Sequence, residues 1–132
     1  MTNRITKQVI VMRKDLKMRR GKEIAQGGHS VISFLTRRMK NTNSKKRIYE
    51  VTLSQAEQEW IDSGFTKIAV SVDSEEELID IYNKAKESGL EVHLITDSGK
   101  TEFNGIPTKT CLAIGPDYAD RIDKITGHLK LL

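Results

Sequence analysis

The sequence predicts an α/β fold: a three-layer α/β/α domain built around a mixed four-stranded sheet. Four short runs rich in β-branched residues indicate buried strands. Stretches in which apolar residues recur at helical spacing lie between most of these runs. The predicted order along the chain is β-α-α-β-α-β-β-α, and strands that alternate with helices favour a sheet with crossover helices on both faces.

The first predicted strand is Gln8–Met12 (QVIVM), a run of mostly β-branched residues between charged neighbours. A helix is expected from Gly21 to about Met39, where apolar residues follow a helical period. The next segment, Lys40–Arg47 (KNTNSKKR), is polar and turn-prone, and we expect it to be a loop.

Two capped helices are expected in the middle of the chain, Ser54–Ser63 and Ser74–Ser88. Each begins with a serine that is followed three residues later by a glutamate, Glu57 or Glu77, which is the pattern of a capping box. A glycine follows each helix and favours its end there. The second predicted strand, Thr66–Asp73, lies between the two helices.

The last third of the chain contains two predicted strands, Glu91–Thr96 and Thr110–Ile114. The short loop Asp97–Thr108 between them favours antiparallel pairing, which makes the sheet mixed. We expect Gly115-Pro116 to turn the chain and the last helix, Asp117–Ile125, to be capped by its own first residue. No repeat or linker interrupts residues 1–132, so we expect a single domain.

Composition narrows the class of protein. The single cysteine, Cys111, excludes an internal disulfide framework and fits a reducing cytoplasm. One Cys and three scattered His make a zinc site improbable, so we expect no metal and no cofactor. We find no signal peptide pattern and no apolar run long enough for a bilayer, and we therefore expect a cytoplasmic protein without membrane contact.

Positive charge is concentrated in the first part of the chain. Residues 1–50 contain 14 Lys or Arg and 3 Asp or Glu, whereas residues 51–132 contain 8 and 15. This asymmetry favours a basic face and a polyanionic partner, most simply nucleic acid. The alternative is a basic segment that only aids solubility.

Two loops are expected to form the functional site. Arg13–Lys22 follows the first strand and Asp97–Thr108 follows the third, so the two loops meet at one sheet edge if those strands are parallel. The pair Gly27 and Gly28 weakens the first helix, and we expect it to permit close approach of a backbone or ligand. Tight packing beneath a solvated run of charges is the alternative.

Four stretches resemble one known family. KQVIVMRKDLKMRRGKEIAQGGH, DSGKTEF, TKTCLAIGP and TGHLKLL occur in this order from end to end of the chain, and together they are similar to the type 2 peptidyl-tRNA hydrolases of archaea and eukaryotes. Three departures are visible: the family's alanine-rich helix is IAQGGHS here, its D-x-GRTQ loop is DSGKTEF, and the segment from His29 to Trp60 is longer.

The resemblance implies hydrolysis of the ester between a peptide and the 3′ ribose of tRNA, with no metal. The matching positions form a set of polar residues on the first helix, the loop after strand three and the last strand. They are Lys22, Gln26, Asp97, Thr101 and Thr110 as catalytic residues, with His29 as active-site support.

The chemistry of an ester assigns hypothetical roles to these residues. Lys22 stabilises developing negative charge, and Asp97 holds Lys22 or orients water. Four cations that follow the first predicted strand would bind tRNA phosphates; they are Lys14, Lys17, Arg19 and Arg20. Two alternatives stay open: a non-catalytic RNA-binding or protein-adaptor module, and a hydrolase of another acyl ester or amide. The oligomeric state is open, with a homodimer as one candidate.

Overall fold

The computed structural model describes residues 4–100 and 102–132. Its main sheet has four strands in the spatial order β4-β1-β6-β5. These strands are β1 (Thr6–Arg13), β4 (Lys67–Val72), β5 (Val92–Asp97) and β6 (Thr108–Tyr118). β1 pairs parallel with β4 and antiparallel with β6, and β5 pairs antiparallel with β6. The predicted mixed four-stranded sheet is therefore confirmed, and β1 and β5 run in the same direction.

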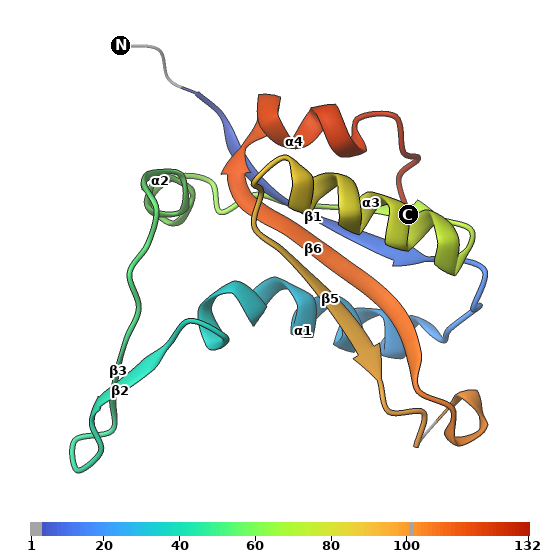
Figure 1. The fold of residues 1–132 in the computed structure, drawn as a ribbon, viewed down its shortest axis with the longest axis horizontal. Coiled ribbons are helices and arrows are strands. Elements are labelled where there is room, and N and C mark those ends of the chain that lie inside the picture. Colours follow the sequence, from blue (N-terminus) through green and yellow to red (C-terminus); the bar gives the residue numbers. More distant parts are fainter. Residues whose placement is uncertain (1–3, 101) are drawn as a thin grey trace.

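Helices cover both faces of the sheet, as predicted. They are α1 (Arg20–Thr36), α2 (Gln55–Asp62), α3 (Glu75–Glu87) and α4 (Ala119–Thr126), with a short 3-10 turn η1 (Phe103–Gly105) between β5 and β6. Figure 1 shows α1 on one side of the sheet and α3 and α4 on the other. Trp60 of α2 packs edge-on against Phe34 of α1. None of the helices in the described ranges is long and apolar enough to cross a bilayer.

The main core lies between the sheet and the α3–α4 layer. Val9 and Val11 of β1 are almost fully buried, together with Leu78 of α3 and Ile122 of α4. A smaller cluster, including Met12 and Cys111, lies on the other face of the sheet. Burial on both faces explains why the strand sequences are continuous apolar runs rather than alternating ones.

The predicted capping box forms completely at α2 and partly at α3. Both bonds of the first predicted box form, since the Ser54 Oγ accepts from the Glu57 amide at 3.1 Å and the Glu57 carboxylate accepts from the Ser54 amide at 2.8 Å. Ser74 also caps its helix by accepting from the Glu77 amide. Within the described residues, the reciprocal bond from the Ser74 amide to the Glu77 carboxylate is not formed.

The segment predicted as a loop forms the first strand and the turn of a β-hairpin, so the prediction is wrong for residues 40–43 and confirmed for the turn at 44–47. β2 (Lys40–Asn43) pairs antiparallel with β3 (Ile48–Glu50), and every residue from 40 to 50 is exposed. A hairpin without a buried face has no apolar alternation, which is the signal used to find strands. The preceding helix α1 also ends at Thr36 rather than near Met39.

The predicted turn at Gly115-Pro116 is also wrong. Both residues lie inside β6, which continues to Tyr118, and α4 begins at Ala119. Pairing with β1 extends the strand, because Thr6 lies opposite Tyr118 across a register shift. The Asp117 side chain does not cap α4 and instead accepts from the Tyr118 amide at 2.6 Å and from Arg121 at 3.0 Å.

Candidate active site

The site is centred on an ion pair between α1 and the end of β5. The Lys22 Nζ donates to the Asp97 Oδ1 at 2.8 Å, and the two side chains are only 15% and 12% exposed. Because β1 and β5 run in the same direction, the segments that follow them leave the sheet at the same edge. The sequence argument that these two loops meet is therefore confirmed.

Asp97 is held by two further groups besides Lys22. The Gly99 amide donates to Oδ2 at 2.9 Å, and the Gln26 amide group donates to Oδ1 at 3.4 Å. The hydrogen bond from Lys22 lowers the pKa of the Asp97 carboxyl below its ordinary value, although partial burial acts in the opposite direction. Asp97 is therefore ionised at neutral pH and is a weak base.

The turn after Asp97 requires glycine at position 99. Gly99 has a φ of +82°, and a Cβ there would lie 2.4 Å from the Ile106 carbonyl oxygen. Only glycine combines a left-handed backbone with such a close approach. This residue keeps its amide aimed at the Asp97 carboxylate.

Gln26 connects Asp97 to Thr110. The Thr110 hydroxyl, which is fully buried, donates to the Gln26 Oε1 at 2.5 Å. The Cys111 Sγ donates to the Gln26 backbone oxygen at 3.5 Å. Lys22, Asp97, Gln26 and Thr110 thus form one continuous polar chain across α1, β5 and β6.

The structure brings together four of the five residues that the resemblance marked as catalytic. The fifth, Thr101, lies outside the described residues. His29 is exposed on α1, three residues beyond Gln26, and its ring has no hydrogen-bond partner among residues 4–100 and 102–132. Gln26 and His29 therefore point to the same side of the helix, with His29 at the outer rim of the site.

One segment at this edge of the sheet carries a group of positive charges. The four cations expected to bind phosphate are all exposed and lie between the end of β1 and the first residue of α1. They are Lys14, Lys17, Arg19 and Arg20. Their neighbour Arg13 is instead paired with Asp15 at 2.6 Å.

Two contributors to the site were missed by sequence reasoning. The Gly99 amide had a visible signal, because Asp-Ser-Gly is typical of a turn in which an aspartate accepts from the amide two residues later. The contact between Cys111 and Gln26 had no local signal, since it joins residues far apart in the chain. Cys111 is buried, and burial raises the pKa of its thiol to about 11, so the thiol stays protonated at neutral pH.

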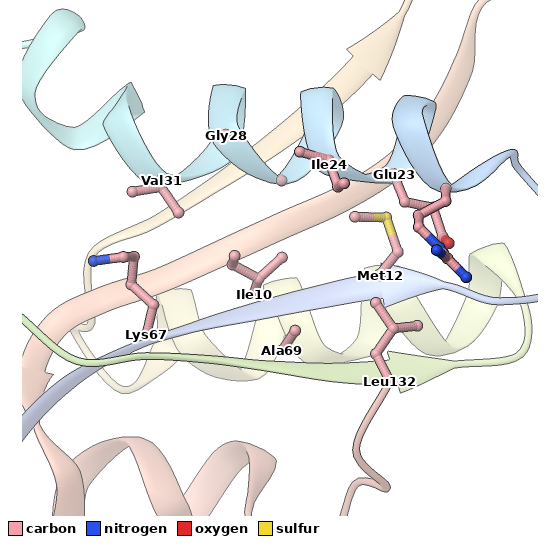
Figure 2. Close-up of a pocket in the computed structure, with 11 residues that line it drawn as sticks. Ile10, Met12, Glu23, Ile24, Gly28, Val31, Lys67, Ala69 and Leu132 are labelled. Atoms are coloured by element: carbon pink, nitrogen blue, oxygen red, sulfur yellow. The ribbon is translucent and has the colours of Figure 1, made fainter.

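An apolar groove runs along the opposite flank of α1. Figure 2 shows Ile24 and Val31 of α1 pointing toward Ile10 and Met12 of β1, with Leu132 at one end. The groove has a volume of about 490 Å³. It adjoins β1 and β4, whereas the polar chain contacts β5 and β6, so the two features lie on different sides of the helix.

The glycine pair lies beside this groove. A Cβ on Gly27 would make ordinary contacts of 3.7 Å with Ile10 and 3.8 Å with Met12, and a Cβ on Gly28 would meet nothing within 4 Å. The prediction that a neighbouring backbone approaches these glycines closely is therefore wrong. Approach by a ligand stays a prediction.

No group of three or more His, Cys, Asp or Glu side chains that could hold a metal ion occurs within the two described ranges.

Comparisons with known proteins give consistent names. A family model described as peptidyl-tRNA hydrolase PTH2 matches residues 6–132. A peptidyl-tRNA hydrolase from Methanocaldococcus jannaschii is 47% identical over 127 residues, which cover 96% of this chain and 99% of that protein. A probable peptidyl-tRNA hydrolase 2 from Drosophila melanogaster is 41% identical over 96% of this chain and 61% of its own length.

A solved structure shows a likeness of fold alone. It is a protein of unknown function from Agrobacterium tumefaciens, with a TM-score of 0.55 and 13% sequence identity. The match covers 96% of this chain and 97% of the other.

Proposed function

This chain belongs to the PTH2 family of peptidyl-tRNA hydrolases, and from that premise we propose that it hydrolyses the ester between a peptide, or an N-blocked amino acid, and the 3′ ribose of tRNA. The products are free tRNA and the released acid. One observation supports the proposal above the others: the Lys22–Asp97–Gln26–Thr110 chain lies at the same edge of the sheet as the segment that carries the four exposed cations.

Lys22 supplies positive charge for the transition state. Attack of water on the ester carbonyl carbon places negative charge on the carbonyl oxygen, and breakage of the bond to the ribose places it on the leaving oxygen. Lys22 is the cation of the polar chain. Asp97 holds its ammonium group in place by an ion pair of 2.8 Å. A proton from the attacking water passes to the ribose oxygen as the ester bond breaks.

Asp97 acts as an orienting group. Its lowered pKa makes it a poor proton acceptor, so we assign it the positioning of Lys22 and of the attacking water. Gln26 extends the same network toward water and the ribose hydroxyls, and the buried Thr110 holds the Gln26 side chain in place by its hydrogen bond. Cys111 is excluded as a nucleophile, because its thiol is buried and stays protonated at neutral pH.

The substrate's tRNA part is bound by the cations at the same edge. Lys14, Lys17, Arg19 and Arg20 are exposed, so their charges are free to meet phosphate groups. The proposed compartment is the cytoplasm, where one free cysteine stays reduced.

We also propose a homodimer that covers the apolar groove. Ile24, Ile32 and Leu132 are 68%, 50% and 50% exposed, and a monomer rarely leaves large apolar side chains clustered in water. Ile24, Gly28 and Ile32 form one i±4 ridge of α1 with a notch at its middle. Two such ridges fit together about a two-fold axis, since each isoleucine meets the other helix beside its glycine.

The test of the proposed activity is single-turnover release of labelled peptide from an N-blocked aminoacyl-tRNA. We expect the chain to release the peptide and Lys22→Ala to lose most of that rate. Binding of tRNA without release would support the non-catalytic module instead. Release only from a simple acyl ester or amide would support the other hydrolase.

A further inference from the structure

The hairpin β2–β3 has no role in the site described above. It follows the C-terminal end of α1 and extends away from the sheet, as Figure 1 shows. The segment belongs to the stretch between His29 and Trp60, which the resemblance marks as longer than the family pattern. Its 11 residues, 40–50, are all exposed.

The hairpin is strongly basic. Lys40, Lys45, Lys46 and Arg47 are balanced by Glu50 alone. Within the part of the chain that the structure describes, none of these four cations forms an ion pair. Four polar residues (NTNS) separate Lys40 from Lys45, and their side chains supply further hydrogen-bonding groups.

An ion pair with a buried carboxylate fixes the base of the hairpin. Arg38 donates to both carboxylate oxygens of Glu57 at 2.7 and 3.0 Å and to the Thr52 carbonyl at 3.0 Å. The Glu57 side chain is only 3% exposed. Burial opposes its ionisation, but hydrogen bonds from Arg38 and Ser54 outweigh this and hold the pKa of Glu57 below its ordinary value. The hairpin is thus anchored to α2 at its base.

Two apolar side chains are exposed on the hairpin itself. Ile48 and Tyr49 are 42% and 56% exposed. A two-stranded hairpin without a core gains little stability by itself, so it contributes surface rather than packing. Cations beside an exposed aromatic ring suit a nucleic acid. Its phosphates would meet the cations, and its bases or sugars would meet the ring.

We propose that the β2–β3 hairpin is a second RNA-binding element, which contacts phosphates in the body of the tRNA at a distance from the ester. This proposal rests on the proposed function. The 17 residues of α1 separate the hairpin from the Lys22 end of the helix. At about 1.5 Å per residue, that separation is roughly 25 Å. Only a substrate much longer than its terminal nucleotides contacts both ends.

RNA fits the hairpin better than a membrane does. A base-paired nucleic acid carries a dense row of phosphates that several cations in an exposed arm meet at once. An interfacial membrane anchor needs a wide apolar face, whereas residues 40–50 present only Ile48 and Tyr49 as large apolar side chains.

The test compares two substrates that carry the same N-blocked aminoacyl ester, one on full-length tRNA and one on a short CCA oligonucleotide. The variant is Lys45→Glu with Lys46→Glu. We expect kcat/KM on full-length tRNA to fall about tenfold or more at low salt. The slope of log(kcat/KM) against log salt should become shallower by about two units, one per lost phosphate contact. The rate on the short substrate should stay within twofold of that of the unmodified chain.

A matched control reverses Lys84 and Lys86 on α3, which lies on the other face of the sheet. Both lysines are exposed, so the change in net charge is the same. We expect this control to behave like the unmodified chain on both substrates. Circular dichroism establishes that both variants are folded.

Three outcomes would overturn the inference. The hairpin variant could keep the unmodified rate and slope on full-length tRNA. Its kcat/KM could fall equally on both substrates, which would make the hairpin a support of the active site. It could lose binding to vesicles with 30% phosphatidylserine while tRNA hydrolysis is unchanged, which would make the hairpin a membrane contact. Failure of the unmodified chain on both substrates is a different result and would overturn the proposed function itself.

Discussion

At the residue scale, the Lys22–Asp97 pair differs from an ordinary surface ion pair. A pair in open water contributes about 0–1 kcal/mol, because solvent screens both charges. Here both side chains are largely covered, and Asp97 also accepts from Gly99 and Gln26. The pair is therefore fixed in position, which is what a preorganised electrostatic site requires.

We expect Lys22→Ala and Asp97→Asn each to lower the hydrolysis rate by about 100-fold or more, the usual cost of removing one preorganised charge-stabilising group. The double variant should lose less than the product of the two single losses, because the residues act as one unit. Single-turnover rates test both statements. The control is Lys84→Ala, which breaks the exposed pair of Lys84 with Asp80 and should leave the rate unchanged. Near-full rates in a folded Asp97→Asn would remove Asp97 from the mechanism.

The pKa of Asp97 gives a prediction with a definite sign. Lys22 lowers this pKa in the folded protein, so the pair stabilises the fold above the ordinary pKa of Asp. That stabilisation is lost as the pH falls through the lowered value. Carbon-13 NMR titration should place the Asp97 midpoint below the ordinary value of an aspartate, and Lys22→Ala should raise it. An Asp97 midpoint at or above the ordinary value would contradict the assignment.

The glycines divide into two classes that stability measurements separate. Gly27→Ala should raise stability by about 0.5–1 kcal/mol, because this site lies inside α1 and has room for a methyl group. Melting temperatures should therefore rise by a few degrees. Gly99→Ala should lower the melting temperature, since its backbone is left-handed and its Cβ would overlap Ile106. A lower melting temperature for Gly27→Ala would contradict the ordinary contacts of 3.7 and 3.8 Å expected for its methyl group.

At the element scale, α1 has two chemically different flanks. One carries Lys22 and Gln26 toward β5 and β6, and the other faces the apolar groove beside β1 and β4. Between Glu23 and Arg37 the chain has no charged residue. A long exposed helix face without charge is unusual for a solvated surface, and this is the physical reason to place a subunit contact there.

We expect Ile24→Glu to convert the proposed dimer into a monomer, because it places a charge on the apolar ridge. Light scattering with size-exclusion chromatography measures the mass directly. The matched control is Ile61→Glu on α2, which is also exposed, at 41%, but lies away from the groove. A monomeric mass for the unmodified chain at micromolar concentration would contradict the dimer.

The elements differ in how far the sequence predicts them. Strands and helices with a buried face were found, since burial imposes an apolar period on the residues. The β2–β3 hairpin was missed because residues 40–50 have no buried face. The end of β6 was missed because Gly115 and Pro116 usually mark turns, and only pairing with β1 shows that the strand continues.

The candidate site could also be predicted only in part. Lys22 and Asp97 could be placed at one edge of the sheet from the direction of the strands, before any contact was known. The bond between Thr110 and Gln26 could not be predicted from spacing, because it depends on how α1 lies over β6. The roles of all four residues stay predictions until kinetics test them.

At the scale of the whole molecule, charge is divided between two halves of the sequence. The cations of residues 1–50 lie mainly before α1 and in the hairpin after it, at the two ends of one helix. The acidic excess lies in residues 51–132, which include α3 and α4 on the other face of the sheet. A polyanion is thus attracted to the α1 side and repelled from the opposite side.

This distribution predicts that charge reversal before α1 weakens tRNA binding through electrostatics alone. For Arg19→Glu with Arg20→Glu, we expect lower affinity for tRNA and a log affinity–log salt slope reduced by about one unit per lost phosphate contact. Filter binding across a range of salt concentrations measures both quantities. The reversal of Lys84 and Lys86 on α3 again serves as the control and should keep the unmodified slope. An unchanged slope for the arginine variant would mean that tRNA phosphates do not contact this edge. When the arginine variant is combined with the hairpin variant in one chain, the two changes in slope should add. The reason is that the two groups of cations lie at opposite ends of α1 and share no partner.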